Sequence, residues 1–157
     1  MYQIHLSNLQ SQLRIDEAAI EMVVQTTLTT EQVDRAELVI AIVDDERIHE
    51  VNREHLEHDY PTDVISFLYD AIPSGRAHRK LRGAGLSLDG ELVISAETAM
   101  REAAEYGWEA FDELTLYLVH GTLHLCGYDD QSESERDLMR AREIAILQKF
   151  DIEPHYT

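Results

Sequence analysis

The stretch from Glu109 to Cys126 constrains the fold of this chain more than any other segment. On an ideal helix each residue turns by about 100°, and with that rotation the apolar residues of this stretch cover most of the circumference. Gly127 follows at the point where a left-handed residue would end the helix. A helix that is apolar on most sides has to be buried, so we expect it at the centre of a folded domain. Its single polar stripe carries Glu113, Tyr117, His120 and His124.

Two histidines on this stripe, His120 and His124, lie roughly 6 Å apart at their Cβ atoms if the stretch is helical. Asp130 follows six residues after the second histidine, and a chain that reverses at Gly127 can bring its carboxylate back toward them. Imidazole and carboxylate are ordinary zinc ligands, and a site with three protein ligands keeps a position open for water. The sequence therefore predicts a metal site for one ion at His120, His124 and Asp130. The alternatives are hydrogen-bonded core histidines and, for Asp130, an acid at a helix N-terminus.

The same segment differs at two positions from the metzincin peptidase pattern H-E-x-x-H-x-x-G-x-x-H. Gly121 stands where that pattern has glutamate, and Asp130 stands where it has the third histidine. The glutamate is the general base of those peptidases. Peptide hydrolysis would need another base, so it is the least favoured activity.

The rest of the chain alternates short β-branched runs with helical periodicity. We expect strands at residues 2–7, 37–43, 64–69 and 91–95. We expect helices at residues 16–28, 44–55, 95–107, 109–126 and 132–150, four of them begun by the capping residues Asp16, Asp44, Ser95 and Ser132. Residues 70–86 have the glycines and proline of a loop, and Asp89-Gly90 is a turn signal. Strands early and helices late predict one α+β domain over residues 1–157, with about five helices.

Charge and cysteine content limit the classes of partner. The single cysteine, Cys126, excludes an intramolecular disulfide and fits a reducing compartment. Neither a signal peptide nor a membrane-spanning apolar run is recognisable, so we expect a cytoplasmic protein without a membrane partner. The formal net charge of −18 opposes nucleic-acid binding by the protein as a whole. A local basic patch, which is either a phosphate contact or a solvated loop, comprises Arg76, Arg79, Lys80 and Arg82.

Three blocks of the sequence, in order, resemble the YbeY family of metal-dependent endoribonucleases of bacterial ribosomal RNA maturation. They are Asn52 with the P-T-D-V-I-S-F run at 61–67, the G-E-L-V-I-S run at 90–95, and H-G-T-L-H-L-C-G-Y-D-D at 120–130. The resemblance implies an α+β fold with a small mixed sheet and a metzincin-like metal-binding helix. It also implies one zinc ion at His120, His124 and Asp130, and a single-stranded RNA substrate. The implied partners are small-subunit ribosomal RNA, whose 3′ end is matured, and the small subunit or its assembly factors in ribosome quality control.

The chain departs from the family pattern at two positions. Asp130 stands where most members have histidine, and its negative charge should weaken the ion as a Lewis acid and alter metal preference. Leu56 stands where the family has an arginine thought to meet substrate phosphate. Arg53, nearly one helical turn earlier, is a candidate substitute; its alternative is a solvated helix residue. Thr62, Asp63 and Ser66 are expected to line the cleft near the metal or, alternatively, to serve as turn and strand caps.

The function expected from these observations is that of a zinc-dependent, single-strand-specific endoribonuclease in ribosomal RNA processing. Metal-bound water would attack the phosphodiester, and no side chain is assigned as a catalytic base. The alternative, which Leu56 motivates, is a non-catalytic ribosome-assembly binding factor with a structural metal. A metallopeptidase ranks below both.

Overall fold

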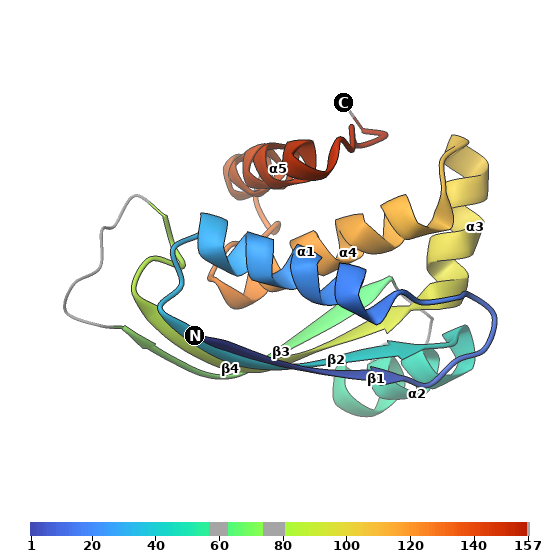
Figure 1. Ribbon diagram of the computed structural model, residues 1–157, viewed down its shortest axis with the longest axis horizontal. Helices are drawn as coiled ribbons and strands as arrows, with labels where there is room; N and C mark the ends of the chain where they lie inside the picture. Colours follow the sequence, from blue (N-terminus) through green and yellow to red (C-terminus); the bar gives the residue numbers. More distant parts are fainter. Residues whose placement is uncertain (57–62, 74–80, 157) are drawn as a thin grey trace.

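Helices and a mixed sheet alternate along the chain in the computed structural model, which describes residues 1–56, 63–73 and 81–156 (Figure 1). The elements are β1 (Tyr2–Asn8), α1 (Glu17–Thr30), β2 (Arg35–Val43), α2 (Asp45–Leu56), β3 (Val64–Pro73), β4 (Leu86–Ser95), α3 (Ala96–Tyr106), α4 (Ala110–Leu125), α5 (Glu133–Leu147) and a short 3-10 turn (Gln148–Phe150). The predicted α+β class with about five helices is confirmed. None of the helices in the described ranges has the length and apolar character needed to cross a bilayer.

The sheet has the strand order β1-β2-β4-β3. Strands β1, β2 and β4 run parallel, and β3 pairs antiparallel with β4 at the edge. Central strand β2 is apolar on both faces because alternate residues enter different cores. Leu38, Ile40 and Ile42 face the main core, whereas Ala41 and Val43 pack into a second core on the opposite face.

Helices cover both faces of this sheet unequally (Figure 1). Helix α2 lies against one face, where Ile48 completes the smaller core. Helices α1 and α4 cover the other face, and α5 lies over them. Helix α4 is thus enclosed between the sheet and α5, which explains why its sequence is apolar on most sides. Its buried residues include Leu114, Leu118 and Leu123.

Gly121 on α4 packs closely against the sheet. A Cβ atom at this position would lie 2.9 Å from Cδ2 of Leu92 and 3.0 Å from Cγ2 of Val64. A larger side chain here would require the side chains of Leu92 and Val64 to shift. Close packing therefore favours glycine at the position of the peptidase glutamate.

The predicted loop at residues 70–86 was wrong at both ends, because β3 continues to Pro73 and β4 begins at Leu86. The predicted turn at Asp89-Gly90 was also wrong, since both residues lie inside β4. A Cβ at Gly90 would meet the carbonyl oxygen of Phe67 at 2.8 Å, beside an irregularity in the pairing of β3. Glycine inside a strand marks such a close backbone approach as readily as a turn.

The four predicted helix caps form as expected. The side chains of Asp16, Asp44, Ser95 and Ser132 each accept a hydrogen bond from the backbone N–H three residues later. At Ser132 the bond from the N–H of Glu135 to the serine side chain forms, but the reciprocal bond of the predicted capping box is not among the described contacts. The carboxylate of Glu135 binds Arg82 instead of reaching back to the cap.

Candidate metal centre

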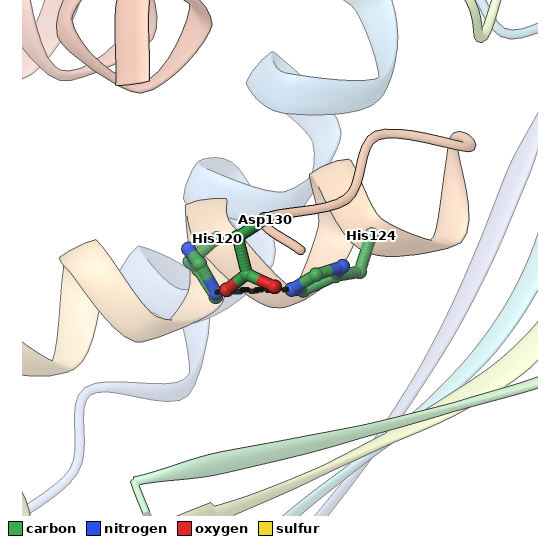
Figure 2. Close-up of side chains that lie close together, drawn as sticks. All are labelled: His120, His124 and Asp130. Carbon is green, nitrogen blue, oxygen red and sulfur yellow. Dashed lines mark hydrogen bonds and ion pairs between the residues drawn. The ribbon is translucent and has the colours of Figure 1, made fainter. Parts of the chain in front are cut away.

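Three potential ligand side chains converge at the C-terminal end of α4 (Figure 2). The Nε2 atoms of His120 and His124 lie 3.1 Å apart, and Oδ2 of Asp130 lies 3.8 Å from each of them. In a tetrahedral zinc site, with ligands at about 2.0–2.2 Å, neighbouring ligand atoms are roughly 3.3 Å apart. The observed separations bracket that value, so this donor set fits zinc after small side-chain adjustments.

Asp130 reaches the histidines because the chain reverses immediately after α4. The N–H of Gly127 donates to the carbonyl of His124 at 3.0 Å, and the N–H of Tyr128 donates to the carbonyl of Leu123 at 3.2 Å. This pair of bonds is a Schellman motif, which requires a residue of positive φ after the helix. Gly127 supplies it with φ of 106°. The reversal predicted at Gly127 is therefore confirmed.

The second nitrogen of each histidine is held by the protein. Nδ1 of His120 binds Oε2 of Glu143 in a short contact, and Nδ1 of His124 lies 3.0 Å from the carbonyl oxygen of Tyr128. An acceptor at Nδ1 places the proton there and leaves the Nε2 lone pair facing the site. Glu143 is buried and also accepts a 2.5 Å hydrogen bond from the Tyr156 hydroxyl. Both rings are thus oriented for metal binding by their Nε2 atoms.

The two histidines differ in basicity. Burial lowers the pKa of His124, and the neighbouring His120 lowers it further. Burial also acts to lower the pKa of His120, but the hydrogen bond and charge of Glu143 outweigh it, and the pKa is raised. Glu143 therefore makes His120 the more basic of the two ligands.

Two hollows meet at these ligands. An open groove is lined by Ser66 on β3 and by His124, and a cavity of about 560 Å³ lies on the other side of His120. Asp63, His120 and Asp130 line both. His120 and Asp130 can therefore be reached from both hollows.

Two of the predicted substrate-binding residues lie at this groove. Ser66 donates from Oγ to the carbonyl of Gly121 at 3.1 Å, and Asp63 accepts the N–H of Val64 at 2.7 Å through Oδ1. Both also line the groove. Asp63 thus lines the groove and also caps the start of β3, whereas Ser66 lines the groove and bonds to α4 instead of capping a turn or strand. Substrate binding by either residue stays a prediction.

The other predicted substrate contacts are not brought to the ligands. Arg53 is exposed on α2, which lies under the opposite face of the sheet, and it is not among the described residues lining either hollow. Arg82 donates to both carboxylate oxygens of Glu135 at 2.6 and 2.9 Å and to the carbonyl of Gly127 at 3.1 Å. Its described contacts thus hold the turn after α4. Thr62, Arg76, Arg79, Lys80 and the side chain of Leu56 lie outside the described residues.

Glu143 and Tyr156 were missed in the sequence. One signal pointed to Glu143, because it occupies the buried stripe of α5 together with Met139, Ile146 and Leu147. An acid at a core position of an amphipathic helix needs a buried partner. That partner, His120, is 23 residues away in sequence, so the spacing alone does not identify it.

Comparisons of the sequence and the fold with known proteins identify relatives of this chain. The family described as Endoribonuclease YbeY matches residues 5–151. An Endoribonuclease YbeY of Rhodopirellula baltica is 46% identical over 122 residues, which are 76% of this chain and 57% of that protein. The protein of the same name from Syntrophotalea carbinolica is 38% identical over 152 residues, 96% of this chain and 97% of its own length. The solution structure of a Thermotoga maritima protein covers 100% of this chain and 96% of its own, with a TM-score of 0.54 at 17% identity, and supports the fold.

Proposed function

Because this chain belongs to the YbeY endoribonuclease family, we propose that it is a zinc-dependent endoribonuclease that cuts single-stranded RNA during ribosomal RNA processing. The observation that carries the proposal is the convergence of His120, His124 and Asp130. The proposed substrate is the 3′ end of small-subunit ribosomal RNA. The proposed partners are the ribosomal small subunit or its assembly factors in the cytoplasm. The proposal extends to a role in ribosome quality control.

Each residue of the centre has a distinct task in this proposal. His120 and His124 would hold the ion through Nε2, and Asp130 would complete the set through a carboxylate oxygen. Glu143 and the carbonyl of Tyr128 keep the rings in the binding orientation. A bound zinc ion supplies Lewis acidity toward a phosphate oxygen and lowers the pKa of a coordinated water. We assign no side chain as general base.

The packing of Gly121 supports phosphodiester rather than peptide hydrolysis. The general base of the related peptidase pattern is a glutamate at this position. Here the position is glycine, and its close packing against Leu92 and Val64 disfavours that side chain. No described residue on α4 replaces it next to the first histidine.

Cleavage of an unstructured oligoribonucleotide tests the proposal. The zinc-loaded protein should cut it, and His124→Ala should reduce the rate to that of the metal-free protein. His5→Ala is the matched control, because His5 is an exposed histidine on β1 whose described ion pair is with Glu37. Equal cleavage by the wild type and His124→Ala would contradict the proposal.

A second candidate is a non-catalytic ribosome-assembly factor with a structural metal. It is motivated by Leu56 at the family's arginine position and by the absence of Arg53 from the described residues that line the two hollows. Such a factor would bind small-subunit particles and show no metal-dependent turnover of RNA. The same cleavage assay, together with co-sedimentation on small subunits, separates the two functions.

A further inference from the structure

The cavity beside His120 has features that the metal centre does not use. Its volume is about 560 Å³, and residues of α3, α4, α5 and the C-terminal segment line it. Ligand pockets typically span about 300–1,000 Å³, so one nucleotide can be accommodated. His120 and Asp130 form part of the wall. Anything bound there lies next to the ligands of the metal.

Two arginines at this cavity have no carboxylate partner among the residues that the structure describes. Arg136 and Arg140 are exposed, lie one helical turn apart on α5, and form no ion pair within residues 1–56, 63–73 and 81–156. Arg101 lines the same cavity but is bound to Asp45 at 2.8 Å. Arg140 also lies over the ring of Tyr156, 4.9 Å from its centroid. Two adjacent arginines without a carboxylate at ion-pair distance favour contact with an anionic group of a ligand.

An aromatic ring stands at the same cavity in a fixed orientation. The ring of Tyr106 is nearly parallel to that of His155, with centroids 3.7 Å apart. His155 is in turn held edge-on by Trp108 and lies 3.3 Å from Glu113. Tyr106 is nevertheless 51% exposed. A supported ring with exposed surface is what an unpaired nucleobase stacks on.

The acidic residues of the cavity determine which part of a nucleotide can occupy the interior and which part stays at the rim. Glu113 and Glu143 are buried in the cavity wall, and Asp63, Glu102 and Asp130 also line the cavity. This acidic lining disfavours phosphate in the interior of the cavity. Phosphate is therefore restricted to the rim, where Arg136 and Arg140 are exposed. The uncharged base is the part that can enter.

We propose that this cavity binds one nucleotide of a single RNA strand, with Arg136 and Arg140 contacting phosphate and Tyr106 stacking on the base. The inference rests on the proposed function for the identity of the strand. It adds to that function a subsite that sets where the strand lies relative to the metal.

Salt dependence of RNA binding tests the two arginines. Binding of a fluorescently labelled, unstructured oligoribonucleotide is followed by anisotropy in the His124→Ala background, so that turnover does not interfere. Arg136→Ala combined with Arg140→Ala should raise Kd about tenfold and reduce the slope of log K against log salt by about 0.7 per arginine. The control is Arg47→Ala, which removes one positive charge from the exposed side of α2, away from the cavity, and should leave the slope unchanged.

Tyr106 gives a different signature. Tyr106→Ala should raise Kd about five- to hundredfold at every salt concentration, since stacking carries no charge. Tyr106→Phe keeps the ring and should restore binding. Circular dichroism on each variant confirms that the fold is retained.

The outcomes separate this inference from the proposed function. If the double arginine variant and Arg47→Ala have the same Kd and slope, the subsite is wrong, whether or not the wild type cleaves RNA. If the wild type does not cleave RNA but binding depends on both arginines and Tyr106, the subsite stands and the nuclease proposal fails. Absence of RNA binding by the parent protein overturns the subsite.

Discussion

The two histidines on α4 and the aspartate on the following turn are held in different ways. The side chains of His120 and His124 are 27% and 26% exposed, and each has its Nδ1 fixed by an acceptor. Asp130 is 48% exposed, and its carboxylate accepts no hydrogen bond within the described part of the chain. In the proposed metal centre the two ligands on the helix would thus be pre-oriented, whereas the third would have to be ordered when metal binds. We expect the histidines to set metal affinity and Asp130 to tune it.

The largest expected effect on zinc affinity comes from removing a proposed ligand, either a histidine on α4 or the aspartate on the following turn. His120→Ala should lower zinc affinity by more than the roughly 100-fold upper limit known for outer-sphere changes. Asp130→Ala should lower it less, because the pre-oriented histidine pair remains. Competition with a chromophoric chelator measures both, and His5→Ala serves as the control. An equal loss of zinc affinity in the two variants would show that the hydrogen bonds that orient the histidines do not contribute to metal binding.

The next effect concerns the support of His120. Glu143→Gln keeps the shape of the side chain but removes the charge at Nδ1, and should lower zinc affinity about 10- to 100-fold. Tyr156→Phe removes only the hydroxyl that binds the other oxygen of Glu143, so its effect should be smaller. The chelator assay decides, with circular dichroism as the check on folding. An unchanged Kd for Glu143→Gln would mean that His120 is oriented by packing alone.

The histidine side of this comparison was predictable from sequence, because its determinants are local. The i, i+4 spacing of His120 and His124 and the reversal at Gly127 depend on residues within one helix and its cap. The hydrogen bond to Glu143 that orients His120 was not predictable, since the two residues meet only through the packing of α5 on α4. Gly90 was misassigned for the same reason: what requires glycine there is the backbone of Phe67 on another strand.

A smaller effect is expected from exchanging the third ligand. Asp130→His installs the residue common in the family and replaces a negative carboxylate with a neutral imidazole. The ion should become a stronger Lewis acid, and preference for zinc over manganese should increase, each by a few-fold. Metal competition and cleavage rates with each ion measure this change. A shift toward manganese would contradict the assignment of Asp130 as a ligand that tunes the ion by its charge.

The smallest effect is expected from loosening the turn that carries Asp130. Arg82→Ala removes the bonds to Glu135 and to the carbonyl of Gly127. Both partners are partly exposed, so the contribution is that of a surface ion pair, and zinc affinity should fall by less than about fivefold. Arg101→Ala is the control, because it breaks another arginine–carboxylate pair, with Asp45, away from the turn. A similar loss of affinity in both variants would indicate a general loss of stability.

The effect of Arg82 should also depend on pH with a defined sign. The hydrogen bond from Arg82 lowers the pKa of Glu135 below its ordinary value. A carboxyl whose folded pKa is depressed stabilises the protein above its unfolded pKa, and this contribution is lost as the pH falls through the folded pKa. The difference in thermal unfolding between wild type and Arg82→Ala should therefore be constant near neutral pH and shrink in acid. A difference that persists after Glu135 is protonated would assign the stabilisation to the hydrogen bond from Arg82 to the Gly127 carbonyl. That bond, and not the ion pair with Glu135, would then position the turn that carries Asp130.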